Sequence, residues 1–514
     1  MTTPRLHPDT LAQLPHDVLR PRYPRERLRG GIVHLGIGAF HRAHQAAATE
    51  AALHADAAGA AGEHSLDWGI VGVSLRRPDT RDALAPQQGL YTLALRGVRD
   101  DGSRFAQLQV IGAVIAVLVA ADDPDAVLER IAHAHTRIVS LTVTEKGYCH
   151  DPATGTLNFG DPGIAHDLLH AGAPVTAIGY LARGLQRRMA RGLPPLTLLS
   201  CDNIAANGDT LRGLLLAFCA RVDGALHDWV AERCGFPNAM VDRIVPKTTV
   251  DDAARISDAL GVEDAWPVVG EPFLQWVMED RFVAGRPRWE AGGAQFVEHA
   301  HPFETLKHRL VNGSHSTMAY LGMVAGWATT DRAIAVPAVH ALIAGMMEQE
   351  MLPTLPALPG LDTAAYRRDL LARFANPALQ HKTSQIAMDG SQKIPQRLLA
   401  PIRERLRAGA PFPRLALGVA GWLHFLRGRD EHGAEYRIED PLASSLHALL
   451  AEADARHARE ADRIAAIASF TPVFGDLAAS RVFVETLATH TRMLRERGVL
   501  ATLAAAACTQ ASAA

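Results

Sequence analysis

Three polar residues of one short segment have side chains that could carry acid–base chemistry. The segment "LKHRLVNGSH" contains an amine at Lys307, an amide at Asn312 and an imidazole at His315. Such groups exchange protons with a substrate or hydrogen-bond to its oxygen atoms, and a lysine base working near neutral pH needs a pKa about three units below its ordinary value. Taken singly, each of them is more often a solvated or hydrogen-bonded polar group than a catalyst.

The spacing of these residues sets a condition on the helix that carries them. At about 100° per residue of α-helix, Asn312 and His315 lie roughly 60° apart on one face, whereas Lys307 lies about 140° from Asn312. We therefore expect the lysine to reach the others from the first helical turn or from just before the helix. Glu304, three residues before Lys307, would share its face and could tune it.

A glycine-containing turn near the N-terminus has features of a dinucleotide-binding loop. In "HLGIGAFHRAHQ", Gly36 and Gly38 follow an apolar run that ends at Leu35. Such a turn lets a pyrophosphate approach the backbone N–H groups at the start of a helix. His41 stands where the third glycine of the G-x-G-x-x-G pattern is expected. Taken alone, the motif therefore fits a plain strand-to-helix turn equally well.

An acidic residue that closes the next strand would be the second part of a dinucleotide site. Asp79, in "SLRRPDTRD", is the candidate for binding the adenosine ribose hydroxyls. Its distance of more than forty residues from Gly36 requires a loop insertion between them. Arg76 and Arg77 could instead receive a 2′-phosphate, so NAD is favoured and NADP stays open.

Composition and charge exclude several classes of protein. The 514 residues are 48% hydrophobic and 21% charged, and the net charge of -3 gives no basic field for nucleic acid or an anionic membrane. No apolar run is long enough for a membrane span, and the N-terminal segment lacks the apolar core of a secretory signal. We expect a cytoplasmic protein with a small-molecule partner, and the oligomeric state stays open, a monomer included.

The expected chemistry needs no metal. The five cysteines are scattered without a CxxC pair, as is typical of reduced cytosolic thiols. His41 and His44 form a His-x-x-His pair, but no carboxylate or cysteine set accompanies them to complete a tetrahedral site. A metal-independent mechanism is therefore favoured.

Alternating strands and helices in the first half must position these residues. Runs rich in β-branched residues and leucine predict strands at residues 31–35, 68–75, 107–111, 138–144 and 196–200. Helical patterns at 124–134 and 174–191 open on a proline, which suits a first helical turn. This alternation predicts an α/β fold with a Rossmann-like, doubly wound parallel sheet.

The second half changes to long helical stretches from about Phe303 onward, with linkers rich in Pro and Gly between them. We expect a dinucleotide-binding domain over residues 1–296 and a mainly α-helical substrate and catalytic domain over residues 297–514. In "EPFLQWVMED", Phe273, Trp276 and Val277 have helical spacing, and we expect them to form core rather than an aromatic substrate stack.

Seven ordered motifs resemble those of the long-chain polyol dehydrogenases, the family of mannitol 2-dehydrogenase and fructuronate reductase (mannonate oxidoreductase). They cover nearly the whole chain and read "GIVHLGIGAFHRAHQ", "SLTVTEKGY", "SCDNIAANG", "MVDRIVPKTT", "GEPFLQWVMEDRFVAGRPRWE", "LKHRLVNGSHS" and "DGSQKIPQRLL". The resemblance implies that the glycine turn is a family variant of the dinucleotide loop, in which Phe40, His41 and Arg42 replace the expected helix start. It places the cofactor on Gly36, Gly38, Phe40, Arg42 and Asp79.

The same resemblance implies the catalytic roles. Lys307 would be the general acid/base, Asn312 would hold the substrate oxygen as its charge changes, and His315 would position a neighbouring hydroxyl. Asn203, in "CDNIAANG", would be the second amide of the oxyanion site, and Glu145, in "VTEKGY", would relay protons to the lysine. Asn203 follows a predicted strand and Glu145 ends one, at the sheet edge where ligands bind, and a helix-cap or loop role is the alternative for Glu145.

Substrate-binding residues follow from the resemblance as well. Asp242, in "MVDRI", resembles the family's substrate-binding aspartate, with a salt bridge to Arg243 or Lys247 as the structural alternative. Lys393 and Arg397, in the loop that contains "DGSQKIPQR", could receive hydroxyls or a carboxylate.

The implied activity is the NAD-dependent interconversion of a secondary alcohol and a ketone in an open-chain C6 sugar derivative. The family offers D-mannitol with D-fructose, or D-mannonate with D-fructuronate, and the "TEKGYC" and "DGSQK" segments look slightly more like the second pair. A cofactor-binding regulator without turnover and a sugar isomerase that uses NAD transiently are the alternatives. A regulator need not keep Lys307, Asn312 and His315, so their presence together argues against it.

Overall fold

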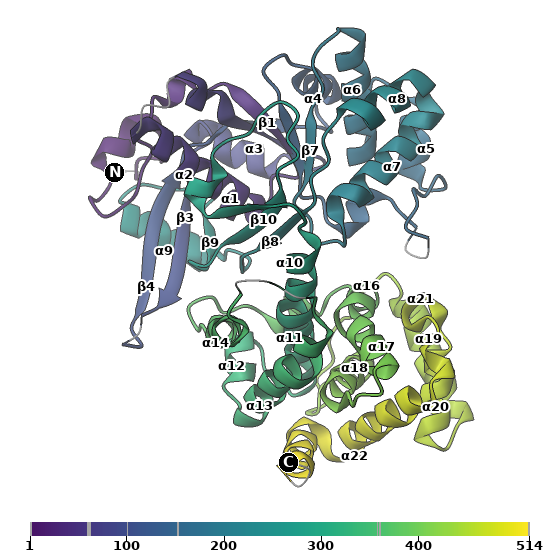
Figure 1. Ribbon diagram of the computed structural model, residues 1–514. Coiled ribbons are helices and arrows are strands. Elements are labelled where there is room, and N and C mark those ends of the chain that lie inside the picture. The colour runs from purple at the N-terminus through teal and green to yellow at the C-terminus, as the bar shows by residue number, and fades with distance from the viewer. Residues whose placement is uncertain are drawn as a thin grey trace. The chain divides into compact units, whose positions relative to one another are not determined.

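The computed structural model divides the chain into two compact units, Met1–Glu304 and Thr305–Ala514 (Figure 1). It describes residues 3–58, 63–99, 101–151, 154–356, 358 and 361–511. The division lies a few residues beyond the expected boundary at residue 296, which would have cut strand β11 (Ala294–Val297). Phe296 of this strand pairs with Met278 of the first unit.

A five-stranded parallel sheet forms the centre of the first unit. Its strand order is β5-β2-β1-β6-β7, and every neighbouring pair is parallel. The bounds are β1 (Gly30–Leu35), β2 (Gly69–Ser74), β5 (Val114–Val119), β6 (Ile138–Leu141) and β7 (Thr197–Ser200). Because β1 lies between β2 and β6, the chain winds away from it in both directions, which confirms the doubly wound sheet predicted from the sequence.

Helices cover both faces of this sheet, as its apolar strands require. Along β1, Val33 packs with the residues of one apolar core, whereas its neighbour Ile32 packs in another. Figure 1 shows α6 and α7 on one side of the sheet and α2 on the other. The helices of this unit are α1 (Ala39–Ala43), α2 (Gln45–Ala58), α3 (Asp79–Leu84), α4 (Pro124–Ile131), α5 (Pro162–Leu169), α6 (Ala177–Ala190), α7 (Asn207–Val222), α8 (Gly224–Arg233), α9 (Val250–Leu260) and α10 (His301–Leu306), which crosses the unit boundary.

Two three-stranded sheets complete the first unit, and one of them corrects a sequence interpretation. The orders are β4-β3-β9 and β11-β10-β8, with β3 (Tyr91–Val98), β4 (Arg104–Ile111), β8 (Ala239–Asp242), β9 (Val268–Gly270) and β10 (Gln275–Glu279). The helical spacing assigned to "EPFLQWVMED" is wrong, since Gln275–Glu279 is a strand between two others. Trp276 and Val277 are buried, as expected of core residues, and burial on both faces of the strand removes the alternation that would have indicated it.

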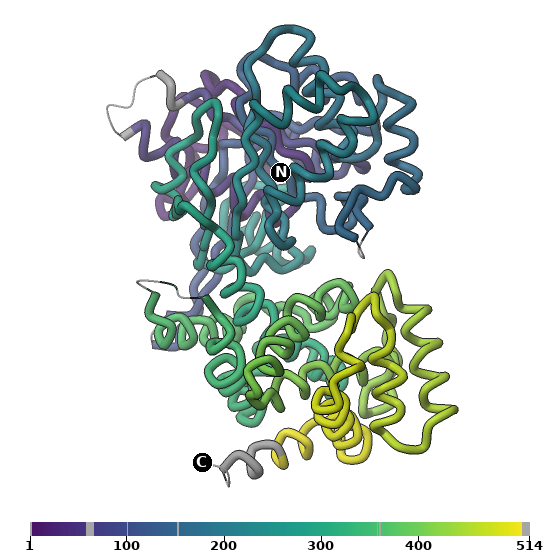
Figure 2. Tube along the Cα trace, turned by 45° about the vertical axis from the view of Figure 1, so that its right-hand side comes forward, coloured from purple at the N-terminus to yellow at the C-terminus, as the bar shows by residue number. Residues whose placement is uncertain are grey.

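The second unit is mainly helical, and no strand longer than an isolated bridge lies in its described part, as Figure 2 shows for the green-to-yellow segment. Its helices are α11 (Ser314–Val324), α12 (Thr330–Ile334), α13 (Pro337–Gly345), α14 (Thr363–Phe374), α15 (Thr383–Ala387), α16 (Gly390–Ile394), α17 (Ala400–Arg407), α18 (Pro413–Phe425), α19 (Ala443–Arg456), α20 (Glu460–Ala468), α21 (Thr471–Phe474) and α22 (Arg481–Ala511). One continuous apolar core joins them, with Trp422 and Tyr320 among its fully buried side chains.

Three stretches of this unit are wound as π-helix: η7 (Lys307–Gly313), η8 (Met346–Met351) and η10 (Pro395–Leu399). They meet at Gly313, where an added Cβ atom would lie 2.7 Å from Cε of Met351 and 3.1 Å from the carbonyl oxygen of Arg397. A glycine therefore lets the three segments approach closely. π-Helical turns are rare and concentrate at functional sites, so η7 identifies the region around Lys307 as a candidate site.

Candidate active site

The glycine turn after β1 has the shape that a dinucleotide requires. Gly36 has a φ of +91°, and a Cβ atom there would lie 2.2 Å from the carbonyl oxygen of Thr142. Around Gly38 the space is open, because the nearest atom to an added Cβ is 3.8 Å away. Helix α1 begins at the next residue without a side-chain cap on its first N–H groups. The residues therefore fit a pyrophosphate at the carboxyl edge of β1, next to the point where the strand order reverses.

Buried histidines hold this turn in place through hydrogen bonds and ring stacking. The His34 ring lies 2.8 Å from Oγ of Ser140 and 2.9 Å from Oγ1 of Thr142, which donates to the carbonyl oxygen of Gly36. His41 stacks on His34 with ring centroids 3.4 Å apart. Burial lowers the pKa of His34 to about 3, so its ring is neutral at physiological pH.

Two of the predicted cofactor residues have side chains held by the first unit itself. The guanidinium of Arg42 donates to the carbonyl oxygen of Trp266 and lies over the ring of Tyr91. Phe40 is half-buried and stacks on His44 at 5.0 Å. These contacts give Arg42 and Phe40 a role in shaping the loop, and a direct contact of either with the cofactor stays a prediction.

Asp79 does not close strand β2, contrary to the position expected from the sequence. The strand ends at Ser74, and Asp79 is the first residue of α3, where its carboxylate pairs with Arg77 at 2.7 Å. A loop of four residues therefore separates strand from acid. The half-exposed carboxylate can still face a ribose, whereas its pairing with Arg77 competes with binding of a 2′-phosphate by that arginine.

Lys307, Asn312 and His315 come to one helical face through the π-helical turn. Lys307 opens η7, in the interior of a helix that begins with α10 and continues into α11, so the expected position in a first turn is wrong. An i→i+5 winding brings residues five apart nearly into line, and Asn312 and His315 then follow the i, i+3 rule. All three side chains are buried.

The surroundings of His315 are basic and aromatic. Its ring packs on Phe374 with centroids 4.3 Å apart and meets His381 edge-on at 5.6 Å. Burial first, and then the basic groups His381, Arg373, Arg397 and Lys307, hold the pKa of His315 well below its ordinary value. Nε2 of His315 is buried without a hydrogen-bond partner among the described residues. A neutral imidazole with an open nitrogen can hydrogen-bond a substrate hydroxyl.

Lys393 and Arg397 differ in what their side chains contact. Nζ of Lys393 donates to the carbonyl oxygens of Ile386 and Met388, at 3.3 and 2.5 Å, which ties the preceding loop to α16. Arg397, in η10, is buried and donates to Oγ of Ser316 at 3.1 Å. Arg397 therefore contacts Ser316, which follows His315 in the sequence. Lys393 instead holds the backbone that precedes α16, which favours a structural role for its side chain.

Asn203 and Glu145 follow adjacent strands of the parallel sheet. Strands β6 and β7 pair with Leu141 opposite Ser200, so the segments that follow them leave the same edge of the sheet. Glu145 is the first residue of the 3-10 helix η5 (Glu145–Tyr148), four residues after β6 ends, and not the end of the strand as expected. Asn203 is exposed in the turn that precedes α7.

Asp242 and Glu304 complete the predicted set in the first unit. Asp242 is the buried last residue of β8, opposite Gln275. Its neighbour Arg243 donates to the carbonyl oxygens of Phe273, Pro272 and Ala43. Both carboxylate oxygens of Glu304 accept the N–H of Ala206, at 3.1 Å each.

Three functional candidates escaped the sequence reasoning. Asp202 is buried and accepts hydrogen bonds from the segment that carries Glu145. It lies inside the motif "SCDNIAANG", which was the feature of the sequence that could have indicated it. Arg373 and His381 influence His315, but nothing in their local sequence indicates it. Their contribution depends on the packing of α14 and the loop after it onto α11.

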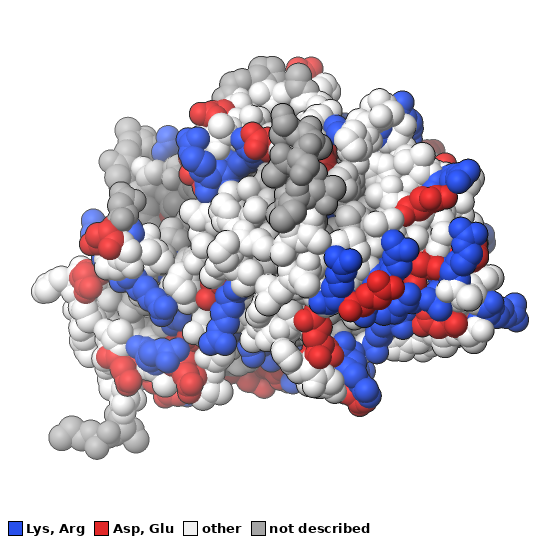
Figure 3. Space-filling model, turned by 90° about the horizontal axis from the view of Figure 1, so that it is seen from below, with Lys and Arg blue, Asp and Glu red and all other residues white. Residues whose placement is uncertain are grey.

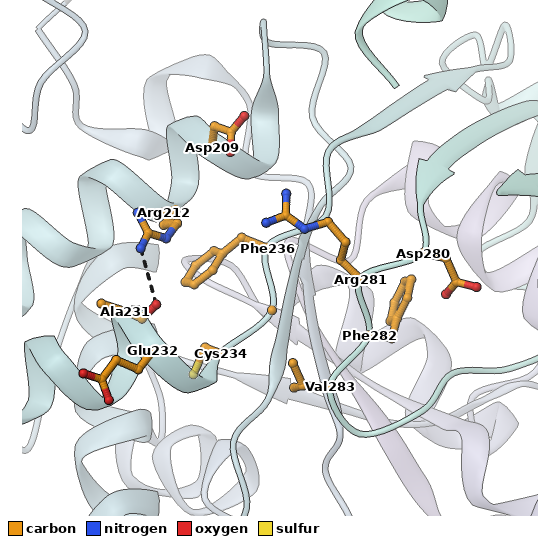
Figure 4. A pocket seen from close by; sticks show the side chains of 11 residues that line it. Asp209, Arg212, Ala231, Glu232, Cys234, Phe236, Asp280, Arg281, Phe282 and Val283 are labelled. Carbon is orange, nitrogen blue, oxygen red and sulfur yellow. Dashed lines mark hydrogen bonds between the residues drawn. The ribbon is translucent and has the colours of Figure 1, made fainter. Parts of the chain in front are cut away.

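A pocket of about 570 Å³ in the first unit does not coincide with these residues (Figure 4). It is lined by charged side chains such as Asp209, Arg212 and Arg281, and by Phe236 and Phe282. Arg212 donates there to the carbonyl oxygen of Ala231 at 3.3 Å. None of the predicted site residues lines it.

Charge on the surface fits a small-molecule partner. Figure 3 shows acidic and basic side chains interspersed over one face, without a continuous basic area. Charged side chains also pair at the surface of the molecule, as exposed Arg429 does with Glu435. Within the described part of the chain, no helix combines the length and the apolar character that a bilayer crossing demands.

A doubly wound sheet with a glycine turn, followed by a helical unit with a buried Lys–Asn–His face, defines a dinucleotide-dependent dehydrogenase of secondary alcohols. Comparison with known proteins narrows this class. Residues 30–291 match the family model of the mannitol dehydrogenase Rossmann domain, and residues 299–495 match that of the mannitol dehydrogenase C-terminal domain. The chain belongs to the mannitol dehydrogenase family, and it is an NAD-dependent oxidoreductase that acts on the CH–OH group of a polyol or sugar acid.

Individual relatives include enzymes of both substrate types. The D-mannonate oxidoreductase of Escherichia coli (strain K12) is 42% identical over 493 residues, which are 95% of this chain and 98% of the relative. The mannitol 2-dehydrogenase of Phaeosphaeria nodorum is 40% identical over 98% of this chain and 85% of its own. The solved ternary complex of Pseudomonas fluorescens mannitol 2-dehydrogenase with NAD and D-mannitol has a TM-score of 0.88 and 39% identity, covering 97% of this chain and 98% of that chain.

Proposed function

We propose that this enzyme interconverts an open-chain C6 sugar acid and its keto acid, of the D-mannonate and D-fructuronate type, with NAD as the redox partner. The observation that carries the choice of an acid is the basic environment of His315. Three cations lower the pKa of its ring, Arg373, Arg397 and Lys307, whereas the neighbouring His381 has a pKa of about 4 and is neutral at physiological pH. A carboxylate bound there would make charge-assisted hydrogen bonds, which are roughly twice as strong as neutral ones.

The Lys–Asn–His face supplies the groups for the chemical step. In the direction of alcohol oxidation, Lys307 takes the hydroxyl proton, and the amides of Asn312 and Asn203 donate to the oxygen as negative charge develops on it. His315 stays neutral and orients a neighbouring hydroxyl through its open nitrogen. Gly36 and Gly38 would hold the pyrophosphate of NAD, and the bound cofactor would supply the acceptor for the hydride of the carbinol carbon. Glu145 completes the set as the group that relays the proton onward.

D-mannitol with D-fructose is the second candidate pair. The mannitol 2-dehydrogenases among the relatives are similar to this chain at nearly the same identity as the mannonate enzyme. A linear polyol would use the same amides and imidazole for its hydroxyl groups, each of which costs about 1 to 3 kcal/mol if buried without a partner. A carboxylate in place of a hydroxyl would add charge-assisted hydrogen bonds to the cations around His315, which favours the acid.

The test is a comparison of steady-state rates with the purified enzyme. NADH oxidation is followed with D-fructuronate and with D-fructose, and NAD reduction with D-mannonate and with D-mannitol. We expect kcat/KM to be at least tenfold higher for the acid pair. A higher value for the polyol pair would assign the second candidate, and the absence of turnover with all four would overturn the proposal. Stoichiometric use of NADH separates the dehydrogenase from an isomerase that regenerates its cofactor.

We also propose that the enzyme works in the cytoplasm. The described cysteines, Cys149, Cys201, Cys219 and Cys234, are all unpaired thiols, as a reducing compartment favours. Burial raises the pKa of Cys149 to about 11, so this half-buried thiol is unreactive. Fractionation of cells that express the chain, followed by the NADH assay, tests the location.

A further inference from the structure

Asp202 connects two segments of the first unit that carry proposed catalytic groups. Its carboxylate accepts the N–H of Val143 at 3.0 Å, the N–H of Thr144 at 2.9 Å and the hydroxyl of Tyr148 at 2.9 Å. All three donors belong to the segment that follows β6 and contains Glu145. Asp202 itself precedes Asn203 in the segment that follows β7.

The segment held by this carboxylate is strained just before Glu145. Thr144 has a φ of +64°, a conformation that a β-branched residue seldom adopts and that the surroundings must enforce. Hydrogen bonds to the N–H of Thr144 and of the residue before it provide this enforcement. Without them, we expect the backbone to relax and the side chain of Glu145 to change direction.

The other segment is fixed just as closely. Nδ2 of Asn207 donates to the carbonyl oxygens of Ser200 and Asp202, at 3.2 and 3.0 Å, and to that of Ala239 at 2.7 Å. The hydroxyl of Tyr148 also lies 2.5 Å from Oγ of Ser200. Asp202 therefore holds the turn after β7 and the turn after β6 in one geometry, together with the contact between Tyr148 and Ser200.

We propose that Asp202 is a positioning residue for the dehydrogenase reaction, because its carboxylate holds the turns of Glu145 and Asn203 in a fixed relation at the sheet edge. It does not touch substrate or cofactor in this scheme, and it acts through its two neighbours. The inference rests on the proposed function, which gives Glu145 and Asn203 their roles. Burial raises the pKa of Asp202 to about 6, and the three hydrogen bonds oppose this rise because they stabilise the ionised carboxylate. The carboxylate is therefore mostly ionised at neutral pH.

The chain provides a matched control for this carboxylate. Asp167 is also fully buried in the first unit, and it accepts the N–H of Val175, the N–H of Thr176 and the hydroxyl of Thr176, at 2.8, 2.9 and 2.6 Å. Like Asp202, it accepts two backbone N–H groups and one hydroxyl, and its carboxylate also lies 3.0 Å from Nδ1 of His166. They fix the start of α6, which carries no proposed catalytic group.

The experiment compares Asp202→Asn with Asp167→Asn in the full-length enzyme. We expect both variants to lower the melting temperature, because each amide presents N–H groups where the carboxylate accepted hydrogen bonds. Only Asp202→Asn should lower kcat, by 10- to 100-fold, with KM for NAD within twofold of wild type, since misplacing catalytic groups slows the chemical step without weakening cofactor binding. Tyr148→Phe, which removes one of the three donors, should lower kcat by 3- to 10-fold.

Amide hydrogen exchange separates failure of this inference from failure of the proposed function. Faster exchange at residues 142–148 and 201–206 in Asp202→Asn, but not in Asp167→Asn, is expected whatever the substrate. Equal loss of kcat in both variants, or unchanged exchange at these residues, would overturn the positioning role. If the wild-type enzyme turned over none of the four substrates, the proposed function would fail together with the catalytic part of this inference, and the exchange data would still decide whether Asp202 holds the two turns.

Discussion

At the scale of single residues, burial distinguishes Lys307, Asn312 and His315 from an ordinary polar helix surface. Their exposed fractions are 6%, 7% and 8%. Burying an amine, an amide and an imidazole on one face costs free energy that a purely structural helix avoids by using apolar residues. We therefore propose that this face takes part in the chemistry, which single-residue changes can test.

Replacing Lys307 by Met should remove the acid/base group while keeping a long side chain. We expect kcat to fall by about 10² to 10⁴, the usual contribution of a general acid/base. NADH binding, measured by fluorescence titration, should change by less than threefold. Lys247→Met, at an exposed position of the first unit, is the control and should keep full activity. A Lys307→Met enzyme with more than a tenth of wild-type kcat would contradict the assigned role.

Replacing Arg397 by Gln should change substrate preference. A buried charge-assisted hydrogen bond is worth about 1.5 to 3 kcal/mol, so we expect KM for D-mannonate to rise by about 10- to 100-fold. KM for D-mannitol should change by less than threefold. Arg403→Gln, which removes a partner of Asp476 at the surface, should affect neither. Equal losses for acid and polyol would show that Arg397 supports the fold through Ser316 and does not select the carboxylate.

Residue types in ordered motifs named the candidate site residues, and their roles stay predictions. The sequence could not show that Arg42 and Lys393 use their charges on nearby carbonyl oxygens, because those contacts depend on the tertiary structure. Asp202 stood in a quoted motif and was still missed. Its importance comes from the donors of another segment, brought to it by the pairing of β6 with β7.

At the scale of secondary structure, the π-helical turn η7 solves a problem of spacing. An α-helix would place Lys307 about 140° from Asn312, whereas an i→i+5 turn brings the two nearly into line. The turn is held by its neighbours, since Gly313 packs closely against Met351 of η8 and the carbonyl oxygen of Arg397 in η10. Its winding is thus coupled to the packing of the helical unit.

Gly313→Ala should therefore destabilise the second unit. The added methyl group would meet Met351 and the Arg397 carbonyl oxygen, and overpacking of this kind costs about 1 to 3 kcal/mol, which exceeds the gain of up to about 1 kcal/mol in helix propensity. Gly213→Ala in α7, where an added Cβ atom meets nothing within 4 Å, is the control and should be neutral or stabilising. Scanning calorimetry checks both, and a Gly313→Ala protein as stable as wild type would show that the three segments separate easily.

Elements were predicted well where periodicity was unambiguous and poorly where burial removed it. The five predicted strands all exist, four of them in the parallel sheet and one as β4. Strand β10 was mistaken for a helix, because it is buried on both faces and short apolar runs do not distinguish the two structures. The π-helical turns have no signature in a single sequence, since the extra residue per turn is tolerated only in this packing.

At the scale of the whole molecule, the two units have separate apolar cores. Buried residues of Thr305–Ala514 form one cluster, and those of Met1–Glu304 form three others. The helical unit also contains buried histidines that are neutral in the folded state. Burial lowers the pKa of His381, His424 and His490 to about 4.

The helical unit should therefore lose stability in mild acid. A histidine with a folded pKa of about 4 and an unfolded pKa of about 6.5 takes up its proton mainly on unfolding, so stability is lost as pH falls from about 6.5 towards 4. For His490 this amounts to about 2 kcal/mol at pH 5. His490→Leu should reduce the difference in unfolding free energy between pH 7 and pH 5 by that amount, and His447→Leu, at an exposed position, should leave it unchanged. Equal pH dependence in both variants would contradict the buried neutral state.

The π-helical winding of η7 also predicts how many residues a homologue needs between its lysine and its histidine. His315 follows Lys307 by eight positions. The π-helical turn contains one residue more than an α-helix would have between two side chains aligned in this way. A homologue shortened by a single position between these landmarks would turn its amine away from its imidazole, even with every side chain retained. The number of residues between the lysine and the histidine therefore predicts whether a homologue can align the two side chains.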